Sequence, residues 1–487
     1  MNDQNQASRV QLIEYLQSYF LGVGFNELNE QVINKNNCVL CGTCSSICPR
    51  IGMNEKEPTL LNYDPECSTC FRYCPQTYFP EELFDKELFH DGVNKNYTLG
   101  FYQKSTAAKS NDVNILKVAQ NGGVVSSLLV HALEGGLVDG VLLTTRDENW
   151  HPQPIVARTS DEILSCAGSK YTIAPSVVTY KDAVYDLKLK NLAFVGMPCQ
   201  IRAVRKLQLL SPLSEEYGKF KLIIGLYCSS NYSYDLMKLF VQGELRVPLS
   251  KVKKIDISLG KFKVFTKNGL TKEVPIKETK KYYWPSCQFC RDYSAEFADI
   301  SIGSVGVSKN DWNTVLLRTD IGLSLFNDAL KAKKIISSND LDLGRIEKEA
   351  LRKKTKLPQI DEKLLNTIQL LNVSDTEVKL YTTLVSLGNA TAPILSKMMN
   401  IEQDTVLEAL QKLKHRRWII APNGSYKAVN PTIIFNNEIY KLKQNFFEID
   451  WHRKYLLIIL LIKSYPRHLP KSAKTFNHLL VILITCS

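Results

Sequence analysis

Hydrophobic and polar positions follow different patterns in different parts of this 487-residue chain. Between residues 100 and 335, short apolar runs bounded by polar residues or glycine are typical of strands, and segments with helical spacing lie between them. The strand-like runs are VDGVLLTT, NLAFVG, KLIIGLYC, KVKKIDISL and ADISIGSVG, and SSLLVHALEGG has the pattern of a helix ended by glycine. This alternation predicts an α/β domain built on a mixed sheet.

The pattern changes on both sides of this region. Residues 8–34 have helical spacing and lead into a loop-rich segment at 35–80, whose order would come from bound metal rather than from an apolar core. The charged helix LGRIEKEALRKKTK is followed, at about 360–435, by three helical patterns and then WIIAPNGSYKAV, where Asn423-Gly424 predicts a hairpin. Three helices and a hairpin predict a winged helix-turn-helix.

Charge is unevenly distributed along the chain. The formal net charge is +12, and six basic residues but no acidic ones follow Asp450. This tail is interpreted either as a poorly ordered terminus or as a peripheral anchor on an anionic membrane surface. No apolar run approaches the ~20 residues of a membrane span, and the N-terminus lacks a signal-peptide pattern. We expect a cytoplasmic protein, with peripheral contact to the inner membrane face as an option.

Thirteen cysteines are many for such a chain, and seven of them fall between residues 38 and 74. Their close spacing suits metal better than disulfides and indicates a reducing compartment. The motif CVLCGTCSSICP has the spacing C-x2-C-x2-C-x3-C-P, typical of a bacterial iron–sulfur cluster, and its cysteines are Cys38, Cys41, Cys44 and Cys48. A zinc knuckle is the alternative, although zinc sites use paired C-x2-C units.

A second stretch, YDPECSTCFRYCP, fits the same template with Asp64 in the first position. In two-cluster ferredoxins the fourth cysteine of one run ligates the other cluster. The first cluster would then use Cys38, Cys41, Cys44 and Cys74. The second would use Cys48, Cys67 and Cys70, with Asp64 or a non-protein ligand at its fourth iron. The alternatives for Asp64 are a turn cap before Pro65, a three-iron cluster, or a four-iron cluster with an exchangeable corner.

Four further cysteines lie far apart in the sequence. They are Cys199 in FVGMPCQ, Cys228 in GLYCSSNYSY, and Cys287 and Cys290 in PSCQFCRDYSAEFADISIGSVG. Spacing alone makes the C-x2-C pair a weak metal signal and the other two ordinary core thiols. Together with NGGVVSSLLVHALEGGLVDGVLL and ARTSDEILSCAGSKYT, however, these motifs resemble the family of coenzyme F420 hydrogenase/dehydrogenase beta subunits over roughly residues 100–335.

The resemblance implies a domain that binds FAD and a 4Fe-4S cluster and exchanges a hydride with the deazaflavin coenzyme F420. It places the cluster ligands on Cys199, Cys228, Cys287 and Cys290. The ferredoxin-like segment ahead of this domain is similar to the electron-input subunit of coenzyme F420H2 dehydrogenase. Electrons would pass from reduced coenzyme F420 through FAD, this cluster and the two N-terminal clusters to a redox partner protein or membrane complex, and the reverse flow is equally compatible. The family often has Gly-Asp where this chain has Gly303-Ser304.

Two glycine-containing loops are the candidate flavin-binding elements. Gly122 and Gly123, followed by Ser126, precede a helix and would let backbone N–H groups approach a phosphate, although such a pair is often only a turn. The second loop contributes Gly168, Ser169, Lys170 and Tyr171, with Lys170 near a phosphate or the flavin ring, or simply solvated. Arg158 could pair with the acidic tail of the deazaflavin or make an ordinary ion pair. No catalytic acid or base is predicted, because the cofactors carry the chemistry.

Residues 372–429 resemble the winged helix of TrmB-like archaeal transcription regulators. Ser374 and Glu377 form a capping-box pair, and EQDTVLEALQKLKHRR would be the recognition helix. Its first half carries three acidic residues, which phosphates would repel, whereas basic residues cluster at its end. DNA binding and a protein-interaction or structural role therefore both remain open.

These observations predict an α/β (α+β) multidomain oxidoreductase. We expect a ferredoxin-like domain with two 4Fe-4S clusters at 1–95, a beta-subunit-like FAD and 4Fe-4S domain at 96–345, a winged helix-turn-helix at 360–435 and a basic tail at 436–487. A redox-sensing DNA-binding regulator is a second hypothesis. A third is a family relative acting on a different redox substrate, as relatives acting on sulfite or chlorophyll derivatives do.

Overall fold

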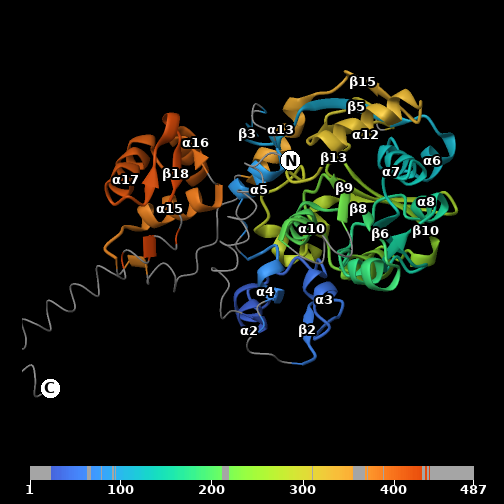
Figure 1. Ribbon diagram of the computed structural model, residues 1–487, viewed down its shortest axis with the longest axis horizontal. Coiled ribbons are helices and arrows are strands. Elements are labelled where there is room, and N and C mark those ends of the chain that lie inside the picture. The colour runs from blue at the N-terminus through green and yellow to red at the C-terminus, as the bar shows by residue number, and fades with distance from the viewer. Residues whose placement is uncertain are drawn as a thin grey trace, which may run out of the picture. The chain divides into compact units, whose positions relative to one another are not determined.

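The computed structural model forms two compact units, Met1–Lys356 and Leu357–Ser487 (Figure 1). The residues it describes are 24–62, 67, 69–77, 79, 81–89, 93, 95–210, 219–309, 311–354, 368–369, 371–387, 389–429, 431, 434–435 and 438. Asp64 and the basic tail after Asp450, for which the sequence makes predictions, lie outside them. The helix expected over 8–34 is described only from residue 24 on.

An eight-stranded mixed sheet organises the first unit, in the order β15-β5-β14-β13-β9-β8-β6-β7. The four central strands, β13, β9, β8 and β6, are parallel to one another, and the outer ones are antiparallel to their neighbours. The strands span Lys104–Ser110 (β5), Gly140–Arg146 (β6), Pro152–Ala157 (β7), Asn191–Gly196 (β8), Lys219–Leu226 (β9), Ile300–Gly303 (β13), Asn313–Leu317 (β14) and Ile335–Ser338 (β15). The mixed α/β sheet predicted from the alternating pattern is confirmed.

Apolar clusters cover both faces of this sheet. The side chains of each strand alternate between the two faces. In β8, Leu192 and Phe194 join one apolar cluster and Ala193 the other. Helices α7, α8 and α12 contact the sheet (Figure 1); α7 and α12 pack in the cluster that holds Ala193. The helices of this layer are α6 (Val113–Val118), α7 (Val124–Glu134), α8 (Ser160–Ser165) and α12 (Asp320–Lys331). Gly135 caps α7, as its sequence predicted.

The opposite cluster joins α10 (Pro198–Leu210) to the cysteine-rich N-terminal segment. Cys41, Cys70 and Phe84 pack in the same apolar core as Leu192 and Phe194. The N-terminal elements are α2 (Phe25–Leu28), η1 (Asn29–Ile33), α3 (Thr43–Ile47), β1 (Ile51–Met53), β2 (Pro58–Leu60), α4 (Thr69–Tyr73) and α5 (Glu81–Leu88), and α9 (Thr179–Lys181) and η2 (Asp182–Asp186) pack beside them. The cysteine-rich segment is thus part of the same packed body as the sheet.

A smaller antiparallel sheet, β10-β11-β12, packs its apolar side on the π-helix η3 (Leu236–Glu244). Its strands are Val252–Ser258, Lys261–Thr266 and Thr271–Pro275. The remaining elements of the first unit are β3 (Lys95–Asn96), β4 (Gly100–Phe101), η4 (Leu249–Lys251), η5 (Ile276–Tyr282), η6 (Pro285–Gln288) and α13 (Leu343–Lys354).

The described residues of the second unit include three helices and a three-stranded antiparallel sheet in the order β16-β18-β17. Its elements are α15 (Asp375–Leu387), β16 (Asn389–Ala390), α16 (Ala392–Met399), α17 (Gln403–His415), β17 (Ile419–Ile420), η7 (Pro422–Gly424) and β18 (Tyr426–Ala428). β17 and β18 pair around Asn423-Gly424, so the hairpin is confirmed. The capping box is also confirmed, since Ser374 N–H donates to Glu377 and Glu377 N–H donates to Ser374 Oγ.

Candidate functional site

The sheet brings Cys199 and Cys228 together from distant parts of the sequence. Each follows the carboxyl end of a strand, Cys199 after β8 and Cys228 after β9, and these two strands are parallel neighbours. Loops at the carboxyl ends of parallel strands are where such sheets build their binding sites. Cys199 lies at the start of α10, which runs back across the sheet.

A loop before β13 completes this group, which we call the third cysteine set: Cys199, Cys228, Cys287 and Cys290. The backbone N–H of Asn231 donates to Cys287 Sγ at 3.3 Å, and the N–H of Cys228 donates to the carbonyl of Tyr293 at 2.9 Å. Burial raises the pKa of the Cys199 thiol well above its usual range, and the charges of the other three members raise it further. Cys199 therefore lies close enough to the other three thiols for their charges to act on it.

The first cysteine set, Cys38, Cys41, Cys44 and Cys74, lines one cavity together with apolar residues such as Val32 and Met53. The pKa of the Cys38 thiol is raised to about 12, mainly by burial and further by the charges of Cys41 and Cys74. Cys74 comes from the second motif, as the exchange pattern predicts. The fold therefore places the last cysteine of the second motif, Cys74, at the same cavity as the first three cysteines of the first motif.

The second cysteine set consists of Cys48, Cys67 and Cys70. Burial raises the pKa of the Cys70 thiol to about 12, and the next causes are the charges of Cys67 and Cys48. The Cys67 thiol lies 3.4 Å from Thr69 Oγ1. Asp64, the proposed fourth member, belongs to residues that the structure does not describe, so its role as a ligand stays a prediction.

Within the described part of the chain, no three histidine, cysteine or acidic side chains converge closely enough to hold a single metal ion. A four-iron cluster is wider than one ion, and its thiolates stand further apart around it. The chemistry of the donors is also selective, because all-thiolate sets favour iron–sulfur clusters. The donor chemistry of the three sets is therefore compatible with iron–sulfur clusters.

Two buried lysines support this fit. Lys206, fully buried on α10, donates to the carbonyl of Cys74 at 2.6 Å, and burial lowers its pKa to about 7. Lys353, on α13, donates to the carbonyl of Cys228 at 2.7 Å. Burial lowers the pKa of Lys353, but the charges of Cys290 and Cys228 outweigh burial, so that its pKa is raised. Buried cations need nearby negative charge, which thiolate-bound clusters supply.

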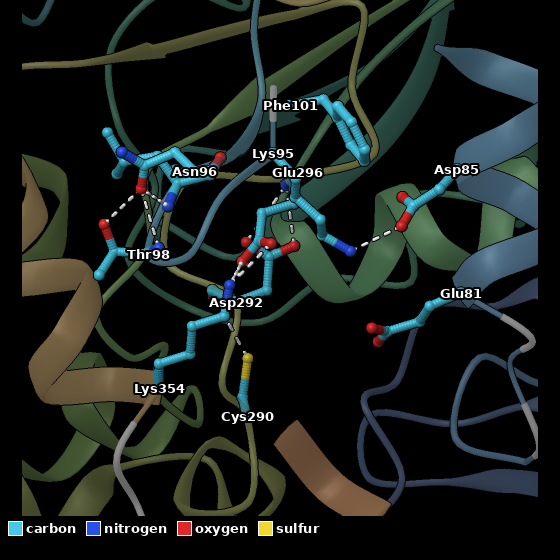
Figure 2. A network of polar contacts seen from close by, with 12 residues as sticks. Glu81, Asp85, Lys95, Asn96, Thr98, Phe101, Cys290, Asp292, Glu296 and Lys354 are labelled. Atoms are coloured by element: carbon cyan, nitrogen blue, oxygen red, sulfur yellow. Dashed lines mark hydrogen bonds and ion pairs between the residues drawn. The ribbon is translucent and has the colours of Figure 1, made fainter. Parts of the chain in front are cut away.

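Polar contacts extend from the third set towards α13 (Figure 2). The Cys290 thiol lies 3.6 Å from the carbonyl oxygen of Asp292, whose carboxylate accepts from the N–H of Glu296 at 3.0 Å. The Glu296 carboxylate pairs with Lys354 at 2.8 Å. Burial raises the pKa of Glu296, although Lys354 opposes this shift. The loop of Cys290 is therefore anchored to α13 through a half-buried ion pair.

The first candidate flavin loop precedes α7. Gly123 has φ +72°, a left-handed conformation that favours glycine, and a Cβ on Gly122 would stand 2.8 Å from Oδ1 of Asn313. The side chain of Asn313 also accepts from the N–H of Val124 at 3.4 Å. Both glycines are thus required by the local geometry, and one amide at the start of α7 already has a protein partner. Ser126 lies buried in the first turn of α7.

Gln120 joins this loop to the second candidate loop. Its side-chain oxygen accepts from the N–H of Ser169 at 3.2 Å, and its amide nitrogen donates to the carbonyl of Ile255 at 3.1 Å. Gly168 has φ +84°, and no atom other than the carbonyl oxygen of Val118, at 3.8 Å, lies within 4 Å of a Cβ built there. The structure therefore brings the loops of Gly122–Gly123 and Gly168–Tyr171 together, with β10 beside both.

Lys170 is half-buried in the second loop and donates to the carbonyls of Cys166 and Ala167. Its pKa is lowered to about 8, mainly by burial; the charge of Cys166 opposes this shift and the charge of Arg146 adds to it. The next residue, Tyr171, accepts at its carbonyl from the N–H of Tyr232 at 3.0 Å. Because Tyr232 follows Cys228 in the same loop, the candidate flavin loop adjoins the third cysteine set.

Arg158 is not part of this group. It follows Ala157, which pairs with Val141 at the start of β6, whereas Lys170 feels the charge of Arg146 at the other end of that strand. Arg158 is exposed, and its N–H donates to Glu162 in a helix cap. The pairing of Arg158 with the deazaflavin tail, or with an ordinary ion-pair partner, therefore stays a prediction.

Known proteins are similar to part of the first unit. Models of the coenzyme F420 hydrogenase/dehydrogenase beta subunit match at residues 105–180 for its N-terminal part and 189–341 for its C-terminal part. The coenzyme F420 hydrogenase subunit beta of Methanothermobacter thermautotrophicus is 40% identical over 265 residues, which cover 53% of this chain and 93% of the relative. The chain belongs to the family of coenzyme F420 hydrogenase/dehydrogenase beta subunits.

Two further proteins are similar to this chain. One subunit of the F420H2 dehydrogenase of Methanosarcina mazei is 33% identical over 314 residues, or 61% of this chain and 83% of the relative. A chain of the F420-reducing [NiFe] hydrogenase complex from Methanosarcina barkeri matches with a TM-score of 0.52 and 36% identity, covering 54% of this chain and 92% of that one. The family is thus that of F420-linked oxidoreductases.

The second unit has its own match. The model described as sugar-specific transcriptional regulator TrmB covers residues 368–433. In the predicted recognition helix α17, Glu408 pairs with Lys412 at 2.7 Å; Arg416, which caps the end of this helix, donates to the carbonyls of Leu371 and Asn372. Two of the basic groups expected to face phosphate therefore already have protein partners.

Several residues around the site escaped the sequence analysis. Lys206 and Lys353 contact cysteines more than 100 positions away, and Gln120 joins three separate segments. Lysine in an amphipathic helix normally indicates a solvated face, so the sequence carried no signal for burial. Trp284 donates from Nε1 to the carbonyl of Cys38 at 2.7 Å, and its position directly before the motif PSCQFC could have marked it as an aromatic beside two cysteines.

Proposed function

We propose that this protein is an iron–sulfur flavoprotein oxidoreductase that passes electrons between reduced coenzyme F420 and a redox partner. The observation that carries the proposal is the convergence of three cysteine sets and two candidate flavin loops in one packed unit of a chain from this family. When bound, FAD can accept a hydride and release its electrons singly, and iron–sulfur clusters carry single electrons.

The residues of this chain would bind and orient these groups. The two glycine loops, held together by Gln120, would position the flavin, with Lys170 as the neighbouring cation. The third cysteine set would hold the cluster nearest the flavin, because Tyr232 joins its loop to Tyr171. The first set follows, since Trp284 links the loop of Cys287 to Cys38. The second set would be the exit towards the partner.

Anaerobic purification tests this proposal. Iron, sulfide and flavin are counted, and oxidation of reduced coenzyme F420 with an artificial one-electron acceptor is assayed on the same sample. We expect bound flavin, iron for three clusters, and sustained turnover. Cys290→Ser should lower the iron count and slow turnover, while Cys166→Ser, outside the three sets, should change neither. Flavin-loaded protein that cannot oxidise reduced coenzyme F420 would refute the proposal.

A second candidate function is a redox-sensing regulator that binds DNA through the second unit, and the match to the TrmB model favours it. The two functions differ in turnover. An enzyme sustains electron flux, whereas a sensor shows a redox-dependent shift of a DNA probe with little flux. The acidic first half of α17 and the engaged Arg416 favour the enzyme. The membrane-anchor hypothesis concerns only the tail, which lies outside the described residues.

A further inference from the structure

Lys353 occupies an unusual environment at the end of α13. Only 3% of the surface of Lys353 is exposed. Lysine is rarely buried to this degree unless an opposite charge lies nearby. Its ammonium group donates to the carbonyl of Cys228 at 2.7 Å. A neutral carbonyl offsets only part of the cost of burying a full charge, so further negative charge is required.

The neighbouring Lys354 shows the usual way in which a poorly exposed lysine is neutralised, by an acidic side chain. It pairs with the carboxylate of Glu296, at 2.8 and 2.9 Å. Among the ion pairs of the described residues, none joins a carboxylate to Lys353, although Asp292 contributes a more distant negative charge. Lys353 instead donates into the loop of Cys228, a member of the third cysteine set.

We propose that Lys353 is a positioning residue that raises the reduction potential of the cluster held by the third cysteine set. This inference rests on the proposed function, because it requires a cluster at these four cysteines. A thiolate-bound cluster becomes more negative by one charge when it takes up an electron. A buried cation beside it stabilises the reduced form more than the oxidised form, and low local dielectric strengthens the effect.

The position of Lys353 in the electron route gives this effect a function. The third set adjoins the candidate flavin loop through Tyr171 and Tyr232. A raised potential there would favour the first one-electron transfer away from the flavin. Lys353 also lies beyond residues 189–341, which the model of the family's C-terminal part matches. The helix α13 thus adds a charge to a site whose ligands come from the matched part.

The test uses the full chain, purified anaerobically, with three substitutions on α13. Lys353→Met removes the charge, Lys353→Arg keeps it, and Lys348→Met removes an exposed charge from the same helix. The signal of the third cluster is identified as the one that Cys290→Ser abolishes in electron paramagnetic resonance spectra. Its midpoint potential is then measured in each variant by redox titration, together with the iron content.

We expect Lys353→Met to shift this midpoint to a more negative potential, Lys353→Arg to keep it near that of the unmodified protein, and Lys348→Met to leave it unchanged. Should Lys353→Met lose the cluster, retention of iron in Lys353→Arg would still support a requirement for charge. An unchanged midpoint in iron-replete Lys353→Met, or equal iron loss in both Lys353 variants, would overturn the inference. Absence of any signal sensitive to Cys290→Ser would instead refute the proposed function.

Discussion

Gly42 lies between Cys41 and Cys44 of the first cysteine set and tests how tightly the cysteine-rich segment is held against the sheet domain. Its φ is +88°, and a Cβ there would stand 2.9 Å from both the carbonyl oxygen of Pro175 and the nitrogen of Val178. The left-handed conformation alone costs a non-glycine residue about 1–2 kcal/mol. Forced contact with backbone atoms adds about 1–3 kcal/mol.

Gly136 provides a matched control for Gly42→Ala. It is also left-handed, with φ +69°, but a Cβ there would have no neighbour within 4 Å. Gly136→Ala should therefore show only the conformational cost, at its own position. Both variants are compared with the unmodified protein at equal iron content.

The assay is hydrogen exchange at the amide of Val177, which donates to the carbonyl of Cys41 at 2.9 Å. The conformational and contact costs together, about 2–5 kcal/mol, correspond to roughly 30- to 4,000-fold faster exchange in Gly42→Ala. Gly136→Ala should leave this amide unchanged. Equal exchange at Val177 in the two variants would refute the reasoning that the cysteine loop is locked against this part of the sheet domain.

Three further predictions concern charge and hydrogen bonding. Because the pKa of Lys170 is lowered to about 8, its charge is lost as pH rises through that value, so FAD affinity measured by fluorescence quenching should fall between about pH 7 and pH 9; a fall that persists in Lys170→Arg would contradict this. Arg205→Met leaves Asp299 buried without its 2.8 Å ion pair and should cost about 3–5 kcal/mol in chemical unfolding, with partial recovery on adding Asp299→Asn; a cost below about 1 kcal/mol would argue against it. Trp284→Phe removes the 2.7 Å hydrogen bond to Cys38 and should speed exchange across residues 38–48 about five-fold, corresponding to about 1 kcal/mol; unchanged exchange would show that the bond adds nothing.

Much of this architecture could be predicted from local sequence. The strand patterns gave β6, β8, β9, β10 and β13 because period-two alternation and apolar runs are local properties. The exchange pattern also anticipated that Cys74 would join Cys38, since motif spacing encodes that geometry.

Long-range contacts could not be predicted in the same way. The burial of Lys353 depends on where α13 packs, and the position of Arg158 depends on the register of β7 with β6. Neither is encoded within a few residues of the side chain concerned. Packing of the cysteine-rich segment likewise depends on tertiary structure, because Cys41 and Cys70 share one apolar core with Phe194 of the main sheet.

Helix α10 fixes the distance between the first and third cysteine sets. It carries Cys199 of the third set in its first turn and, seven residues later, Lys206, which holds the carbonyl of Cys74 in the first set. At 1.5 Å per residue this is about 10 Å along the axis. The separation of the two sets is therefore set by a rigid rod rather than by a loop. A one-residue insertion between Cys199 and Lys206 would rotate Lys206 by about 100° about the helix axis, away from Cys74. Helix α10 therefore fixes both the spacing of the two cysteine sets and the contact of Lys206 with the first set.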